Sequence, residues 1–217
     1  MTAANAVPRT LNATQHGYKT HNINGQGVMM YNSPIETAKT LIAKQGNNQR
    51  DMGGTCGLCQ CANILRLAGI EVSEDDVINI AIACGGRTAK DLEMENTNPD
   101  MRGGTSSGAR QEILERFHLM TYIQPISAVD RQSTVGKFAN AVSTGHGVIV
   151  SVDAGILWNI PSAIGGAHAI SLLSVSDRGD MFIYQDTAYG RLGVISAIDL
   201  SRALTGNPAN ITCDVIR

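Results

Sequence analysis

The sequence predicts an α+β fold with two lobes, a helical lobe followed by a lobe built on an antiparallel β-sheet. Helical periodicity and capping signals dominate before Gly147, whereas β-prone apolar runs dominate after it. The 217 residues, 43% of them hydrophobic, are enough for one substantial core and too few for two. We therefore expect a single domain over residues 33–217, preceded by an N-terminal arm over residues 1–32.

Three helices are predicted in the first lobe. The first begins at Ser33-Pro34-Ile35-Glu36, which has a capping-box pattern with proline at the first helical position, and it ends near Gly46. The second runs from Cys56 to Gly69. The third begins at Ser73-Glu74-Asp75-Asp76 and closes at Gly85.

A long loop is expected over Gly86–Gly104, because this stretch is rich in glycine, asparagine and arginine. Long loops in compact enzymes tend to line sites, so this one is a candidate for contact with the substrate. A helix over Ala109–Phe117, a strand over Thr121–Gln124 and a helix over Thr134–Val142 follow, with Ser133 as the expected cap of the last helix.

The second lobe is predicted from short β-prone runs separated by turn signals. These runs are Val148–Val152, the segment around His168, Phe182–Asp186, Gly193–Ile195 and Ile211–Ile216, with one helix near Ile198–Leu204.

Cys56 is the candidate nucleophile. It stands at the start of an apolar helix with Gly54 two positions before it and Gly57 directly after it. The unpaired backbone N–H groups and the positive end of the helix dipole favour the thiolate, which is the form that attacks a carbonyl carbon. A small buried cysteine would give the same local pattern, and this is the expected role of Cys59 and Cys61.

His168 and Asp186 are the candidate base and its orienting carboxylate. A turn signal at Ser176–Asp180 predicts a hairpin that sets His168 beside Asp186 or within a residue or two of it. A carboxylate at that distance can orient an imidazole. A core histidine and a strand-end turn cap are the alternatives for these two residues taken singly. The joint arrangement of thiol, histidine and aspartate favours a catalytic triad, with the nucleophile and the base facing each other across an interlobe cleft.

Composition narrows the classes of partner. The net charge is −2 and no stripe of Lys and Arg is present, so nucleic acid is not expected as a partner. No apolar run is long enough to cross a bilayer, and Met1–Asn32 lacks the charged-then-apolar pattern of a secretory signal. The five cysteines are odd in number and three crowd into one predicted helix, which indicates a reducing environment.

The motifs resemble those of a known family. Cys-Gly-x-x-x-x-Ala-x-x-Leu-Arg-x-x-Gly over residues 56–69, Gly-Ala-His-Ala over 166–169 and Asp-Thr-x-x-Gly over 186–190 are similar to papain-like cysteine peptidases. The likeness is greatest to the bacteriocin-processing type, which cuts leader peptides after a double glycine. Papain-fold glutamine deamidases among bacterial effectors and toxins are similar too, and these motifs do not separate the two groups.

The resemblance implies roles for individual residues. Cys56 would be the nucleophile, His168 the general base and acid, and Asp186 the orienting carboxylate of a papain-like two-lobe fold. It also implies a glutamine six positions before the cysteine as an oxyanion-hole donor, where this chain has Arg50. Gln49, seven positions before Cys56, is the candidate for that role. No metal or cofactor is implied.

Several functions follow from these observations as expectations. The first is a cysteine protease that acts as a bacterial effector or toxin on a protein substrate, with Gly-Gly as a candidate cleavage site. The second is a glutamine deamidase with the same triad. A non-catalytic module, or a zinc site built from Cys56, Cys59 or Cys61 with Cys84 or a histidine, are further alternatives.

The effector hypothesis carries its own expectations about partners and location. The protein would be delivered without a Sec signal peptide, would act in the cytoplasm of the target cell, and would have a cognate immunity protein that plugs the cleft. No membrane partner is expected.

Overall fold

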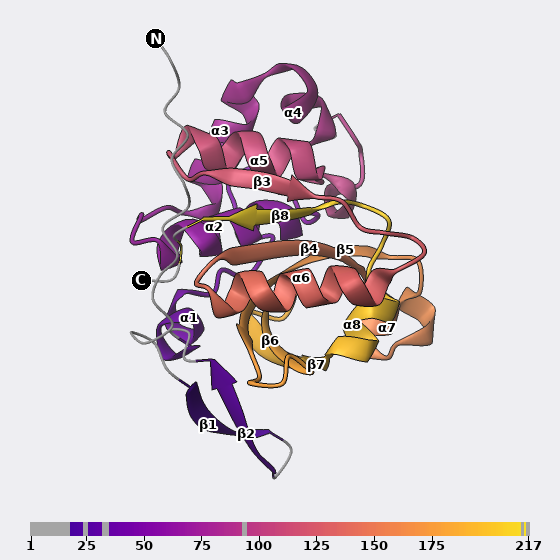
Figure 1. Ribbon diagram of the computed structural model, residues 1–217. Helices are drawn as coiled ribbons and strands as arrows, with labels where there is room; N and C mark the ends of the chain where they lie inside the picture. Colours follow the sequence, from indigo (N-terminus) through magenta and orange to yellow (C-terminus); the bar gives the residue numbers. More distant parts are fainter. Residues whose placement is uncertain (1–17, 24–25, 32–34, 93–94, 214, 216–217) are drawn as a thin grey trace.

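A six-stranded antiparallel sheet separates two groups of helices. The computed structural model describes residues 18–23, 26–31, 35–92, 95–213 and 215 (Figure 1). The strand order is β3-β8-β4-β5-β6-β7, and each neighbouring pair is antiparallel. The strands are β3 (Thr121–Gln124), β4 (Gly147–Asp153), β5 (Ala167–Val175), β6 (Met181–Asp186), β7 (Arg191–Ser196) and β8 (Ala209–Thr212).

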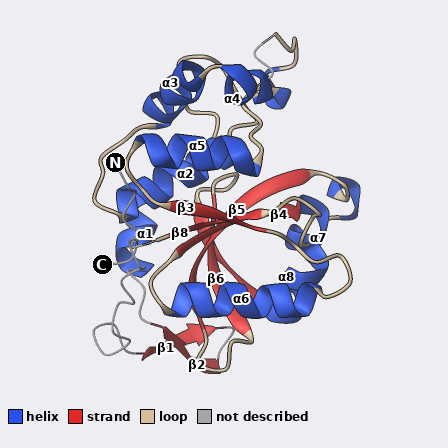
Figure 2. Ribbon diagram, turned by 45° about the horizontal axis from the view of Figure 1, so that its top comes forward, coloured by secondary structure: helices blue, strands red, loops and turns tan. Residues whose placement is uncertain are grey.

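Helices cover both faces of this sheet. Figure 2 shows α2, α3 and α5 on one side of the strands and α6 on the other. The helices are α1 (Ile35–Leu41), α2 (Cys56–Leu67), α3 (Glu74–Cys84), α4 (Gly86–Asp91), α5 (Ser107–Arg116), α6 (Arg131–Ser143), α7 (Ala154–Trp158) and α8 (Ala197–Ala203), with 3₁₀ turns η1 (Pro99–Met101) and η2 (Pro161–Ala163). None of the helices in the described part of the chain has the length and hydrophobicity needed to cross a membrane.

The alternation of side chains along β4 divides the core in two. Val148, Val150 and Val152 pack with residues of α6 and α8, whereas Ile149 packs with residues of α2, α3 and α5. Successive side chains of a strand point to opposite faces, so Ser151 lies on the same face as Ile149. The face of β4 that carries Ser151 is therefore the face turned toward the helical lobe.

The predicted two-lobe α+β fold is confirmed, and so are its main capping signals. Ser73 caps α3 through a reciprocal capping box with Asp76. Gly85 ends the same helix with a φ of 66°, and Gly69 follows α2 with a φ of 83°. Both angles lie in the region that favours glycine, which is why the two helices stop at these positions.

Three local predictions were wrong in detail. The segment expected as a long loop over residues 86–104 contains α4 and η1. The first helix ends at Leu41 and not near Gly46, while its expected start at Ser33 lies outside the described residues. Helix α6 is capped by Asp130, whose carboxylate accepts the N–H of Ser133, so the expected cap Ser133 is the residue being capped.

A β-hairpin that the sequence did not predict lies within the N-terminal arm. Its strands are β1 (Tyr18–Ile23) and β2 (Gln26–Tyr31), which pair antiparallel. Met30 is buried and packs with Ile183 of β6, and it forms a bridge with Ser176 after β5. The hairpin is thereby attached to the end of the β5–β6 ribbon.

Phe138 on α6 provides a test of the core on the far side of the sheet from α2. Its side chain is fully buried among β-strand valines, so Phe138→Ala should lower the free energy of unfolding by about 3 to 5 kcal/mol. Urea unfolding followed by circular dichroism measures this. Val129→Ala, at a residue that is 98% exposed, is the control and should change the free energy by less than about 0.5 kcal/mol. Equal effects of the two substitutions would contradict the assigned packing.

Candidate active site

Cys56 is the first residue of α2, and the start of this helix is packed tightly. The residue is half-buried. A Cβ atom added to the next residue, Gly57, would overlap the Oγ1 atom of Thr105 and would lie 3.5 Å from the Cδ atom of Arg110. Only glycine allows this close approach, so the nucleophile helix begins against the segment that leads into α5.

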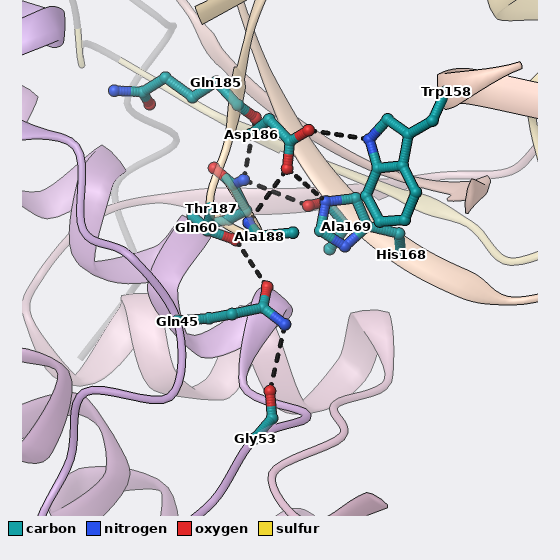
Figure 3. A network of polar contacts seen from close by, with 10 residues as sticks. All are labelled: Gln45, Gly53, Gln60, Trp158, His168, Ala169, Gln185, Asp186, Thr187 and Ala188. Atoms are coloured by element: carbon teal, nitrogen blue, oxygen red, sulfur yellow. Dashed lines mark hydrogen bonds and ion pairs between the residues drawn. The ribbon is translucent and has the colours of Figure 1, made fainter. Parts of the chain in front are cut away.

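His168 and Asp186 lie across the interlobe space from this helix start. His168 is the second residue of β5 and Asp186 is the last residue of β6, and both side chains are buried. The Nε2 atom of His168 lies 3.0 Å from Oδ1 of Asp186 (Figure 3). A carboxylate is an acceptor, so Nε2 carries the proton and Nδ1 is the ring nitrogen left for the thiol of Cys56.

The charges of Cys56 and His168 stabilise each other. Burial disfavours the thiolate, but the hydrogen bond and the charge of His168 outweigh burial and lower the pKa of Cys56. The N–H of Ala169 and the guanidinium of Arg110 act in the same direction. Burial would lower the pKa of His168, but hydrogen bonds to Asp186 and Cys56 raise it to about 9. The arrangement therefore favours a thiolate and an imidazolium together near neutral pH.

Asp186 stays ionised because three donors surround it. Burial alone would raise its pKa, but His168, the indole of Trp158 and the N–H of Ala188 lower it. The Nε1–H of Trp158 donates to Oδ2 over 2.8 Å, and the Ala188 N–H donates to Oδ1 over 3.0 Å. The centroid of the Trp158 ring system also lies 5.1 Å from that of His168. Trp158 was not predicted from the sequence, although it is the only tryptophan of the chain.

Gln60 fixes α2 to the strands that carry the histidine and the aspartate. Its side chain is fully buried one turn after Cys56. Its Nε2 group donates to the carbonyl of Ala169 on β5 over 3.1 Å and to the carbonyl of Gln185 on β6 over 3.0 Å. Ala169 directly follows His168, and Gln185 directly precedes Asp186. One amide on the helix of Cys56 therefore holds all three candidate residues in place.

Gln49, the expected oxyanion donor, does not lie where that role requires. It is exposed, and the hydrogen bond that it makes is from its backbone N–H to Asp75. Gln45 instead lies between the two loops that flank the site. Its Nε2 donates to the carbonyl of Gly53 over 3.1 Å, and its Oε1 accepts the hydroxyl of Thr187 over 3.1 Å (Figure 3).

Glu74 holds the loop that carries Gln45. Its buried carboxylate accepts the N–H groups of Gly46 and Asn47 over 3.1 and 3.0 Å, and the side-chain amide of Asn48 over 3.1 Å. The hydroxyl of Thr55, directly before Cys56, donates to the same carboxylate. One acidic side chain therefore connects the Gln45 loop to the start of the nucleophile helix.

The other cysteines of α2 have a different environment. Cys59 and Cys61 are buried, and burial raises the pKa of each thiol, that of Cys61 to about 12. They are therefore neutral at physiological pH, as expected for small apolar residues. In the part of the chain that the structure describes, no cluster of three His, Cys, Asp or Glu residues could hold a metal ion, which leaves the zinc alternative without a candidate ligand set there.

The thiolate–imidazolium pair can be tested without a substrate. At pH 6, Cys56 should react with iodoacetamide faster than a thiol of ordinary pKa, because its lowered pKa increases the fraction of thiolate. Loss of the imidazolium near pH 9 should change the rate constant of alkylation. His168→Ala should slow alkylation at pH 6 at least about ten-fold, since a pKa higher by one unit removes nine-tenths of the thiolate. Peptide mapping measures the rates, with Cys84 on the same molecules as the internal control. Equal rates at Cys56 in the two proteins would contradict the ion pair.

Comparison with known proteins gives the family and the fold. The Peptidase_C39 like family matches residues 41–204, which is well over half of the chain. The structure is similar to one described as a C39-like peptidase from Bacillus anthracis, with a TM-score of 0.55 and 11% identity, covering 82% of this chain and 97% of that one.

A second similar structure is that of a double glycine motif protease from an AMS/PCAT transporter in complex with the leader peptide. It has a TM-score of 0.47 and 14% identity, and the match covers 79% of this chain and 90% of that one. No curated protein matches the chain. The chain belongs to the Peptidase_C39 like family, and the predicted resemblance to papain-like peptidases of the bacteriocin-processing type is confirmed.

Proposed function

We propose that this protein is a cysteine peptidase that cleaves a protein or peptide substrate with Cys56, His168 and Asp186. The observation that carries the proposal is the chain of contacts from the half-buried thiol of Cys56 through the buried imidazole of His168 to the buried carboxylate of Asp186. Membership of the C39-like family supports the same reaction class.

The proposed reaction is acyl transfer to the thiol. The Cys56 thiolate attacks the carbonyl carbon of the scissile amide, and protonated His168 gives its proton to the leaving nitrogen. Water then attacks the thioester, with neutral His168 as the base, and the thiolate is restored. Asp186 holds the imidazole by its Nε2 proton throughout, so that Nδ1 faces the sulfur.

We further propose that Gln45, and not Gln49, stabilises the oxyanion together with the backbone N–H of Cys56. The Nε2 group of Gln45 uses one hydrogen for Gly53, so its second hydrogen is available to a substrate oxygen. An N–H at the first position of a helix has no intrahelical partner, which makes that of Cys56 a suitable second donor.

The two glutamines form a matched pair for a test. Gln45→Ala should lower kcat by about 100-fold or more, because one preorganised donor to the oxyanion is lost. Gln49→Ala should leave kcat within about two-fold, since the side chain is exposed. Mass spectrometry measures the hydrolysis of a peptide that the wild-type protein cleaves, and circular dichroism checks that the variants fold. A large loss in Gln49→Ala with none in Gln45→Ala would reverse the assignment.

The reaction itself is tested by expressing the wild type and Cys56→Ala in bacterial cytosol and comparing the two proteomes. New peptide termini that depend on Cys56 indicate proteolysis, whereas a gain of about one mass unit at glutamine indicates the deamidase alternative. Cys59→Ala is the matched control and should retain activity, because that thiol is buried and neutral. Identical proteomes and equal growth would count against either enzyme in that compartment.

The effector or toxin role, the cognate immunity protein and delivery without a Sec signal stay predictions. A growth defect that depends on Cys56 in the same experiment would support toxicity. The first scissile sequence to examine among the new termini is Gly-Gly, on the basis of the family resemblance.

A further inference from the structure

A cavity of about 530 Å³ lies between the start of α5 and residues of β3, β4 and the loop before β8. Residues 105–108 line it from the helical side, and Ile123, Ser151, Asn207 and Pro208 line it from the sheet side. We call it the Ser151 cavity. Figure 1 shows α5 running alongside β3 above this part of the sheet.

Two contacts connect the Ser151 cavity to the catalytic residues. Ser151 on β4 pairs directly with Ala169 on β5, the residue after His168. On the other wall, Thr105 is packed against Gly57, the residue after Cys56. Neighbouring strands lie about 5 Å apart, so the cavity begins one strand away from the site of attack. A side chain of a bound peptide close to the scissile bond would reach it.

The polar groups of the cavity offer hydrogen-bond donors. The Oγ of Ser151 accepts the Nη2 group of Arg110 over 3.4 Å, which leaves the Ser151 hydroxyl proton for another acceptor. The Oγ1 of Thr105 is not among these donors, because it is buried against Gly57 at the start of α2. Helix α5 begins at Ser107, and Ser106 accepts the N–H groups of Ala109 and Arg110, which leaves those of Ser107 and Gly108, two residues that line the cavity. A ligand with acceptor oxygens would satisfy groups that the protein itself leaves unpaired.

The electrostatic environment favours negative charge. Arg110 is only 2% exposed, and in the described part of the chain no carboxylate lies within ion-pair distance of it. Its nitrogens bond to neutral partners, namely Asn210 over 2.8 Å and the Thr105 carbonyl over 3.2 Å besides Ser151. Among the described residues, no acidic side chain lines the cavity. One carboxylate contacts a lining residue: that of Asp91 accepts the hydroxyl of Ser106 over 2.6 Å.

We propose that the Ser151 cavity is a specificity subsite that binds a substrate side chain bearing an acceptor oxygen, with Asp and Glu preferred to Asn and Gln. This proposal rests on the proposed peptidase function. A glycine would leave the cavity empty and its donors unpaired, and an apolar side chain would bury the donors without a partner. Sites built to hydrogen-bond a substrate group discriminate strongly against analogues that lack it.

The first experiment uses the full chain and a library of peptides made by digesting a bacterial proteome. Mass spectrometry of the new termini should show Asp and Glu enriched at one fixed position close to the cleaved bond. Four synthetic peptides that differ only there, carrying Glu, Gln, Leu or Gly, then give kcat/KM values. We expect Glu to exceed Gln, and to exceed Leu and Gly by about ten-fold or more.

Two substitutions test the assignment to this cavity. Asn207→Asp adds a negative charge at the rim on an exposed residue and should reduce the Glu-to-Gln ratio several-fold. Asn140→Asp makes the same change on α6, on the opposite face of the sheet, and should leave the ratio unchanged. Ser151→Ala should reduce the preference for Glu over Leu. Asn207→Asp does not alter the core, so the test remains decisive even if the Ser151→Ala protein fails to fold.

The outcomes separate this inference from the proposed function. Cleavage with Gly or Leu accepted as well as Glu, or equal ratios in the two aspartate variants, would overturn the subsite and leave the peptidase intact. Cleavage that requires Gly-Gly would do the same. Absence of any cleavage that depends on Cys56 would overturn the peptidase assignment, and the subsite with it.

Discussion

The contact of the Cys56 thiolate with the His168 imidazolium is the interaction on which the rest of the structure depends. Burial disfavours each charge taken alone, and each charge is favoured by the other beside it. The contact joins the first residue of a helix in one lobe to the second residue of a strand in the other. Any error in how the lobes meet would therefore separate the charges and return both pKa values toward their ordinary range.

Two buried side chains fix the position of Cys56 relative to His168. Gln60 donates to carbonyl groups on β5 and β6, the strands that carry His168 and Asp186. Glu74 connects the loop of Gln45 to Thr55 at the start of α2. Both side chains are buried and use polar groups that would be expensive to leave unpaired. The site is thus held by a few hydrogen bonds of strict geometry, while the two apolar cores on either face of the sheet supply the stability.

The parts of the site that follow from local rules could be predicted from the sequence. The helix start at Cys56 has glycines on both sides, and the turn at Ser176–Asp180 brings β6 back along β5. Ser171 pairs with Gln185, and the same register continued would set His168 opposite residue 188. The prediction reached Asp186 only because it allowed a tolerance of about two residues. The exposed position of Gln49 could not be predicted, because spacing along a chain does not give the path of an irregular loop, in which Gln45 contacts Gly53 while Gln49 is exposed. Trp158 was missed because its partner is 28 residues away and its helix has five residues.

Arg110 connects the chemistry of the nucleophile with the choice of substrate. Its stem packs against Gly57 beside the thiol, and its guanidinium reaches Ser151 and Asn210 on two different strands. The same positive charge helps to lower the pKa of Cys56 and contacts Ser151, a residue that lines the neighbouring cavity. A carboxylate bound in that cavity would partly neutralise the charge, raise the pKa of the thiol slightly and strengthen its hold on the proton. Binding an acidic side chain would therefore lower the fraction of Cys56 present as thiolate, so that one buried cation serves both substrate binding and formation of the thiolate.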